Sequence, residues 1–289
     1  MGRGEQAVAE GAVVPEDRGF TQVPDEVDIE RPSAARMYDY YLGGSCHFAA
    51  DRELAQELIR AWPDMPSIAR ANRDFLQRAV RFLSSRGIDQ FLDLGSGIPT
   101  VGNTHDIALS LNPDARIAYV DVDPVAVAHS TVILQDVPNA TIVHADLRDP
   151  ESILTRSEVA SFLDLSRPVG VIMLAVLHFL TDEDDAPGAV AAYREATAAG
   201  SYLVVSHGTR DYLPAQAREA EDVYRRASHR LNFRSHADVL GLFDGYELES
   251  PGLVDIINWR PELSADEPDP IGGGDVARYS GYAAVGRKP

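Results

Sequence analysis

Acidic residues and a glycine turn at the ends of apolar runs are the groups in this sequence best placed to bind a ligand. The first run ends in Asp-Leu-Gly-Ser-Gly at residues 93–97. Gly95 and Gly97 let backbone amides around Ser96 approach a ligand closely, and Asp93 can orient the turn or accept from a cationic group. A tight turn with nothing bound has the same pattern. The motif therefore indicates a ligand-binding turn only together with the residues that follow it.

A second run ends in Val-Asp-Val-Asp-Pro at residues 120–124. Asp121 stands about twenty residues beyond the glycine turn, where a carboxylate can accept hydrogen bonds from both hydroxyls of a ribose. Val122 is grouped with it as a binding residue. Asp123 is more simply the N-cap of a helix that Pro124 opens, and capping is also the alternative role for Asp121.

A third run ends in His-Ala-Asp-Leu at residues 144–147. Asp146 can accept from the amino group of an adenine while Leu147 packs on the ring, although a solvated loop acid is the alternative. The carboxyl ends of parallel strands converge on one crevice, so three such ends together predict a nucleoside site.

Two classes of cofactor fit that site. A dinucleotide needs Gly-x-Gly-x-x-Gly to admit its pyrophosphate, and the third glycine position is Thr100 here. S-adenosylmethionine has no pyrophosphate, so two glycines, a ribose acid and an adenine acid are sufficient. The sequence favours S-adenosylmethionine and leaves an NAD-dependent oxidoreductase as the weaker alternative.

The elements that must position these residues alternate between β-rich runs and helical patterns. That alternation predicts right-handed βαβ units and a doubly wound parallel sheet. The last two runs have no long helix between them and should pair antiparallel at the sheet edge. The predicted strands are 90–94, 116–121, 140–145, 169–175, 201–207, 243–254 and 279–285, and the predicted helices after residue 87 are 104–111, 124–135, 188–198 and 215–231.

The chain before the first strand divides into two parts. Residues 1–31 have no helical or strand period and are predicted to be a mobile leader. Residues 32–87 are predicted to form a helical cover that begins at a Ser33 cap, and residues 88–289 the main domain. Asn72 is the one polar member of an otherwise apolar stripe on the last helix of the cover.

These residues resemble the class I S-adenosylmethionine-dependent methyltransferases. Four further segments, 35–44, 72–76, 97–100 and 175–180, are similar to an actinobacterial family of such enzymes whose substrate is unknown. The resemblance covers roughly residues 29–288. It implies a Rossmann-like seven-stranded sheet, mostly parallel with an antiparallel last strand, and Ala175 as a further cofactor-binding residue.

One position departs from the general class. Pro99 stands where many class I enzymes have a third glycine, so the loop is stiffer and offers one amide fewer. We therefore expect Tyr38, Asn72 and Arg73 to supply contacts at the methionine end. The alternative is that Asn72 packs on the sheet, that Arg73 is a solvated charge, and that Tyr38 covers the sheet.

Methyl transfer is an in-line displacement, so the protein chiefly positions a nucleophile and excludes water. An oxygen or nitrogen acceptor can need its proton removed, and histidine suits that task near neutral pH. His178, after the fourth strand, is the first candidate base and His207 the second. The alternatives are packed histidines and a regulatory protein that binds S-adenosylmethionine without turning it over.

Composition limits the partners. A formal charge of −19 disfavours nucleic acid and anionic membrane surfaces, so the expected acceptor is a small molecule. The single cysteine and the absence of an N-terminal signal pattern predict a cytoplasmic protein. Lys288 is the one lysine, which argues against Schiff-base chemistry. No metal site is predicted, and the sequence gives no prediction of oligomeric state.

Overall fold

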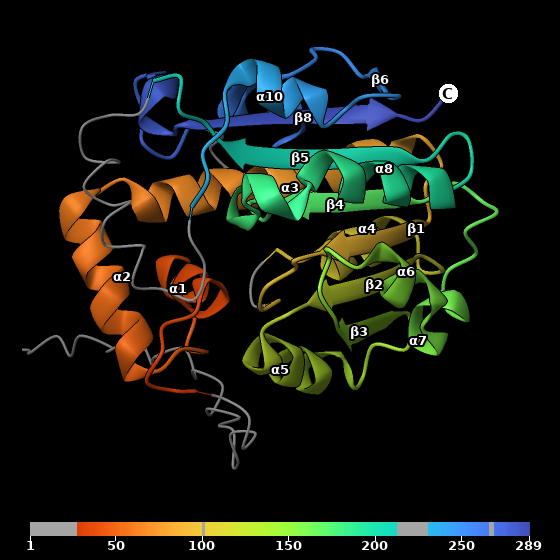
Figure 1. The fold of residues 1–289 in the computed structure, drawn as a ribbon, viewed down its shortest axis with the longest axis horizontal. Coiled ribbons are helices and arrows are strands. Elements are labelled where there is room, and N and C mark those ends of the chain that lie inside the picture. Colours follow the sequence, from red (N-terminus) through yellow and green to blue (C-terminus); the bar gives the residue numbers. More distant parts are fainter. Residues whose placement is uncertain (1–27, 100–101, 213–230, 266–268) are drawn as a thin grey trace, which may run out of the picture.

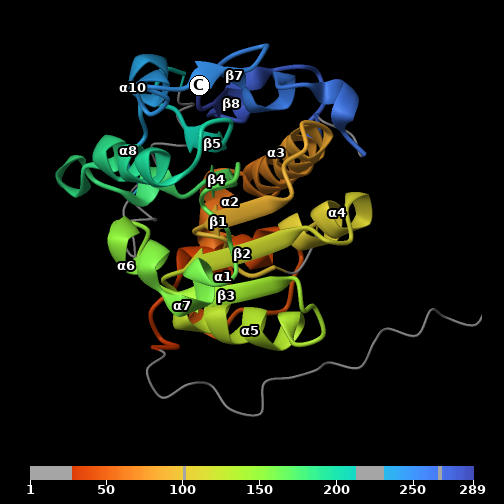
Figure 2. The same ribbon diagram turned by 90° about the vertical axis from the view of Figure 1, so that its right-hand side faces the viewer.

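An inner strand of the sheet is buried at every position. A computed structural model describes residues 28–99, 102–212, 231–265 and 269–289, and β1 (Gln90–Leu94) is paired with a parallel strand on each side. A strand that is apolar on both faces requires a layer of helices on each side. Figure 2 shows α3 (Met65–Ser85) and α4 (Thr104–Leu111) on one side, and α6 (Pro150–Thr155), α7 (Ser157–Ala160) and α8 (Ala186–Ala196) on the other.

The strand order is β3-β2-β1-β4-β5-β8-β6, with β7 also paired to β8. β1 to β5 are parallel, and β8 runs antiparallel to β5, β6 and β7 (Figure 1). The predicted doubly wound sheet with an antiparallel last strand is confirmed. The other strands are β2 (Arg116–Asp121), β3 (Ala140–His144), β4 (Gly170–Leu174), β5 (Tyr202–Gly208), β6 (Glu247–Leu248), β7 (Val254–Asp255) and β8 (Gly281–Arg287).

The edge of the sheet differs from the prediction in one respect. The single strand expected over residues 243–254 is wrong, because two short strands, β6 and β7, flank a turn at Pro251 and Gly252. Proline has no N–H to give to a strand ladder, and Gly252 has a φ of +89°. β7 is therefore an eighth strand. After β1, the described residues also form α5 (Pro124–Leu134), α10 (His236–Gly241), and the 3₁₀ turns Leu177–Phe179, Asp182–Asp184, Ile256–Asn258, Pro261–Leu263 and Val276–Arg278.

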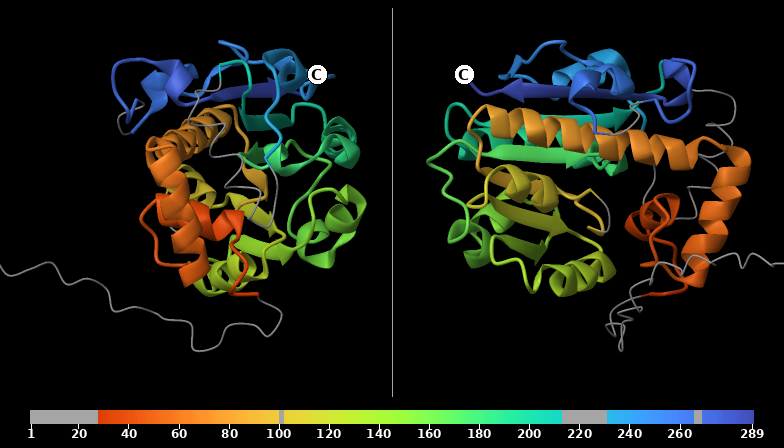
Figure 3. Two further views of the ribbon diagram at one scale, coloured as in Figure 1. Left: turned by 60° about the vertical axis from the view of Figure 1, so that its left-hand side comes forward. Right: turned by 180° about the vertical axis from the view of Figure 1, so that it is seen from behind.

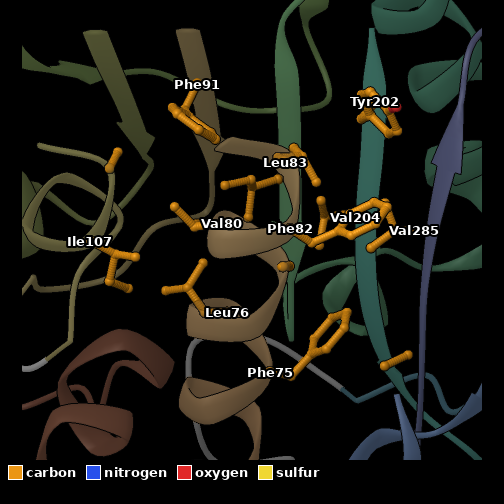
Figure 4. Close-up of a cluster of buried hydrophobic side chains, with 14 of the residues drawn as sticks. Phe75, Leu76, Val80, Phe82, Leu83, Phe91, Ile107, Tyr202, Val204 and Val285 are labelled. Carbon is orange, nitrogen blue, oxygen red and sulfur yellow. The ribbon is translucent and has the colours of Figure 1, made fainter. Parts of the chain in front are cut away.

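Helix α3 contributes its apolar stripe to the core of the sheet. Phe75, Ala79 and Leu83 are fully buried and pack with β1 and β5 side chains such as Phe91 and Val204 (Figure 4). Asn72 lies on the same helix and is also buried. The predicted boundary at residue 87 therefore does not coincide with a break in packing, since the second half of α3 belongs to the main core.

Helices α1 (Ala34–Tyr41) and α2 (Ala49–Ala61) form the cover with the first turns of α3. Their side chains form a separate apolar cluster that includes Met37, Leu58 and Trp62. In Figure 3 they lie beyond the end of the sheet, where α3 extends past the strands. Residues 1–27 of the predicted leader and 215–230 of a predicted helix lie outside the described residues.

Ser33 occupies the N-cap position of α1 but does not cap it. The prediction that its side chain caps the helix is wrong, because the Ser33 hydroxyl donates instead to Asp123 at the start of α5. The N-terminus of the cover is therefore bonded directly to the sheet domain.

Candidate active site

A cavity of about 260 Å³ lies where the carboxyl ends of β1 to β5 face the cover. Every residue that the sequence predicted for the site contributes to its lining, although the residues come from seven segments of the chain. These residues are Tyr38, Asn72, Arg73, Asp93, Gly95, Ser96, Gly97, Asp121, Val122, Asp146, Leu147, Ala175, His178 and His207.

The glycine turn is shaped for a close approach of backbone. Gly95 and Gly97 have φ values of +70° and +62°, which favour glycine. A Cβ on Gly95 would lie 2.2 Å from the Val176 side chain, whereas a Cβ on Gly97 would meet nothing within 4 Å. Gly95 is therefore required by packing, and Gly97 leaves open space beside the cavity.

Two buried carboxylates flank this turn. Asp121 accepts from the N–H of Gly97 at 2.7 Å and from that of Asp123 at 2.8 Å. Asp93 accepts from the Thr104 hydroxyl at 2.7 Å. Burial raises the pKa of each carboxyl to about 6, partly offset by these hydrogen bonds. Both groups are mostly ionised at neutral pH and act as hydrogen-bond acceptors.

Asp123 has the capping role that the sequence predicted. One of its oxygens accepts from the N–H groups of Val125 and Ala126 in the first turn of α5. The other accepts from Ser33 and lies 3.8 Å from Nε of Arg36. Asp123 thus caps a helix with one oxygen and holds the cover with the other.

Asp146, predicted as an adenine acceptor, is paired with a residue that sequence reasoning missed. Nε of Arg148 donates to the Asp146 carboxylate at 2.9 Å, and Nη1 donates to Asp184 at 2.8 Å. The hydrogen bond from Arg148 lowers the pKa of Asp146. The Arg148 position, two residues after Asp146 at the same strand end, was the available signal. Arg148 itself lines the cavity.

Asn72 links three elements around the centre of the cavity. Its carbonyl oxygen accepts from the Ser206 hydroxyl of β5, and its amide donates to the Tyr38 hydroxyl of α1 at 2.9 Å. Ser206 in turn accepts from the N–H of Ala175 at 3.0 Å. Ala175 has a φ of +50°, an uncommon conformation for alanine. This network ties the cover to the tips of β4 and β5.

Arg73 is placed differently from its neighbour. Its guanidinium lies 5.6 Å from the centre of the Tyr38 ring. Its charge also offsets part of the rise that burial causes in the pKa of Asp93. Within the described part of the chain, its buried Nε has no hydrogen-bond partner. A buried donor without a partner costs free energy, so this group is suited to an anionic ligand atom.

His178 and His207 lie together at the β4 and β5 tips, with ring centres 5.6 Å apart. Arg234, which sequence reasoning missed, donates to Nε2 of His207 at 2.8 Å, and Nδ1 of His207 contacts the Gly208 carbonyl at 2.7 Å. Both nitrogens of His207 are occupied, so the geometry does not support the prediction that it is a base. Burial lowers the pKa of His207 to about 4 and that of His178 well below its ordinary range.

Comparison with known proteins identifies the family. The model of a family described as S-adenosyl methyltransferase matches residues 20–289. The chain belongs to this family. It is 39% identical to a proposed methyltransferase from Thermobifida fusca YX, covering 93% of this chain and 99% of that one with a TM-score of 0.84. A DUF574 family protein from Streptomyces avermitilis MA-4680 is also 39% identical, covering 91% and 99% of the two chains at a TM-score of 0.84. No curated protein matches.

Family membership confirms the predicted enzyme class and cofactor: the protein is a methyltransferase that uses S-adenosylmethionine. It decides against the NAD-dependent oxidoreductase and the non-catalytic binding protein. Among the described residues, no helix is long and apolar enough to cross a membrane. The same residues contain no cluster of histidine, cysteine and acidic side chains that could hold a metal ion.

Proposed function

We propose that this enzyme methylates an oxygen or nitrogen atom of a small molecule held beneath the N-terminal cover. The observation that carries the proposal is the lining of the cavity, which includes α1 and α3 side chains as well as the strand tips. An acceptor must therefore fit between the cover and the sheet. The formal charge of −19 further disfavours nucleic acid. A cytoplasmic location, in keeping with one cysteine in the chain, is part of the proposal.

The acid-lined end of the cavity is assigned to the cofactor. Asp121 would accept from the ribose hydroxyls, and Asp146 from the adenine amino group, with Val122 and Leu147 against the ring. Arg73 and Asp93 would pair with the carboxylate and ammonium of the methionine part. Two features support the fit: the unpartnered Nε of Arg73, and the open space beside Gly97.

The opposite end is assigned to the acceptor. Its walls are apolar and aromatic and include Trp62, Met65, Phe179 and Phe233, with His178 among them. When bound, the cofactor supplies a methyl carbon activated by a positive sulfur, so positioning and exclusion of water account for most of the catalysis. The side chains of this end orient the acceptor atom and keep water from the reacting centre.

A labelling experiment tests the proposal. A bacterial extract is separated by ultrafiltration into small-molecule and macromolecular fractions, and each is incubated with the enzyme and S-adenosylmethionine carrying a tritiated methyl group. We expect label in an extractable small molecule, and none with Asp121→Ala. Label on protein or nucleic acid in the macromolecular fraction would contradict the proposal.

A further inference from the structure

A buried arginine lies behind the two histidines of the acceptor end. Arg234 is 7% exposed, and its guanidinium donates to the carbonyls of Leu177 at 2.8 Å and Leu180 at 3.1 Å as well as to His207. In the part of the chain that the structure describes, no carboxylate forms an ion pair with it. Asp182 and Asp238, whose charges reach Arg234, are both exposed. The positive charge is thus held by neutral acceptors.

Arg234 determines which nitrogen of His207 carries the proton. A guanidinium can only donate, so Nε2 of His207 must be an acceptor. The proton is then on Nδ1, which donates to the Gly208 carbonyl at 2.7 Å. His207 is therefore a neutral imidazole with both nitrogens engaged.

The backbone of Gly208 determines which nitrogen of His178 carries the proton. Its N–H points to Nδ1 of His178 at 3.4 Å, so this nitrogen is the acceptor and Nε2 carries the proton. His178 lines the cavity, and no described residue pairs with its Nε2. Burial and the neighbouring His207 and Arg234 keep the pKa of His178 low, in keeping with a neutral ring.

We infer that His178 presents its Nε2–H to the acceptor as a hydrogen-bond donor, backed by Arg234, and that the acceptor atom is an anionic oxygen, a phenolate or carboxylate. This inference rests on the proposed function and narrows it. A donor and a nearby guanidinium stabilise an anion, whereas an aliphatic amine arrives as an ammonium ion that Arg234 repels. Phe179 and Phe233, whose rings lie beside that of His178, also line the cavity, so the oxygen belongs to a molecule with an apolar part.

The proton balance of the reaction agrees with this assignment. The acceptor loses its proton to solvent before it binds, so no side chain has to take one. An oxygen lone pair forms the bond to the methyl carbon, and the electron pair of the broken sulfur–carbon bond stays on sulfur. His178 is then a catalytic residue that touches the acceptor, and Arg234 and His207 are positioning residues.

Nuclear magnetic resonance tests the two tautomers without any acceptor. The protein is labelled with ¹⁵N at its 8 histidines and saturated with S-adenosylhomocysteine, and His178→Gln and His207→Gln assign the signals. We expect the proton on Nε2 of His178 and on Nδ1 of His207, with both rings neutral at neutral pH. An unprotonated Nε2 on His178, or protonation of His178 near neutral pH, would overturn the inference.

Titration of the same sample tests the choice of an anion. We expect formate to shift the Nε2–H resonance of His178 in a saturable way and methylammonium to leave it unchanged, with the formate effect at least about tenfold weaker in Arg234→Met. A response to methylammonium, or no response to formate, would overturn the inference. Both results are independent of where the tritium label appears in the extract, so failure here and failure of the small-molecule proposal are distinguishable.

Two substitutions separate a donor from a base even if Arg234→Met does not fold. His178→Gln retains an N–H donor but cannot take a proton, and His178→Leu retains neither. With the acceptor found by labelling, we expect His178→Gln to stay within about tenfold of the wild-type rate and His178→Leu to lose about a hundredfold. Equal losses in the two variants would overturn the donor role of His178. His236→Gln, at an exposed histidine outside the cavity, is the matched control.

Discussion

The two ends of the cavity contain titratable groups that burial affects in opposite ways. At the cofactor end, burial raises the pKa of Asp93 and Asp121 to about 6. At the acceptor end, it lowers the pKa of His207 to about 4 and that of His178 as well. In each case, loss of water disfavours the charged form. The same physical cause therefore brings the acids closer to neutrality at pH 7 and keeps the histidines uncharged.

The partners of these groups decide what each end can bind. Backbone N–H groups around the glycine turn favour ionised Asp121, so this end offers acceptors to the hydroxyls of a nucleoside. Around the histidines, Arg234 and Gly208 supply donors, so that end offers an N–H to a ligand. One cavity thus has an accepting end and a donating end, which suits two chemically different ligands.

The largest expected effect is on cofactor affinity, when the accepting end loses the Asp121 carboxylate. Asp121→Ala removes the carboxylate assigned to the ribose, and hydrogen bonds to a charged group are worth about 1.5–3 kcal/mol each. We expect the dissociation constant for S-adenosylhomocysteine, measured by calorimetry, to rise about a hundredfold or more. Asp114→Ala, at an exposed acid just before the same strand, is the control. An unchanged affinity in Asp121→Ala would remove the distinction between the two ends.

The donating end is tested through stability. The pKa of His207 is lowered to about 4 in the folded protein from an ordinary 6.5. Below pH 6.5 the unfolded chain therefore binds the proton more readily, and the free energy of unfolding decreases as the pH is lowered. His207→Gln removes this dependence of stability on pH. In urea titrations, we expect the loss of unfolding free energy between about pH 6.5 and about pH 5 to be about 2 kcal/mol smaller in the variant. Equal losses of unfolding free energy in the wild type and in His207→Gln would contradict a buried, neutral His207.

Cofactor affinity should depend on pH through the accepting end. Asp121 has a pKa of about 6 in the unliganded protein, and its proposed hydrogen bonds with the ribose need it ionised. Below about pH 6, we expect the dissociation constant for S-adenosylhomocysteine to rise by up to about tenfold per pH unit. The slope should be shallower in Asp121→Asn, which cannot titrate. A flat profile in the wild type would show that the carboxylate does not bind the ligand.

The smallest expected effect is at the rim of the accepting end. Arg148 pairs with Asp146 and Asp184, but its side chain is 51% exposed, so the pairs are screened by water. For Arg148→Ala, we expect a weakening of S-adenosylhomocysteine binding by about 0.5 kcal/mol, or two- to threefold. Arg167→Ala breaks an equally exposed ion pair with Asp89, outside the cavity lining, and is the matched control. A tenfold effect at Arg148 would mean direct contact with the adenine.

The sheet and the accepting end could be predicted because their signals are local. Buried parallel strands require apolar runs, and the glycine turn and the acids at residues 121 and 146 follow those runs directly. The capping role of Asp123 was predictable for the same reason, since a cap and the helix it begins are adjacent in the chain. Residue type and spacing are sufficient for such features.

The donating end depended on contacts between distant segments. Arg234 reaches His207 across 27 residues, and Ser206 reaches Asn72 across 134. A contact beside the accepting end is equally distant in the chain, because the Ser33 hydroxyl donates to Asp123, 90 residues away. A histidine in a sequence can be a donor, an acceptor or a base, because the neighbours that fix its proton are not its neighbours in the chain. The sequence by itself determined where the cavity lies, and only the tertiary structure decided the direction of its hydrogen bonds.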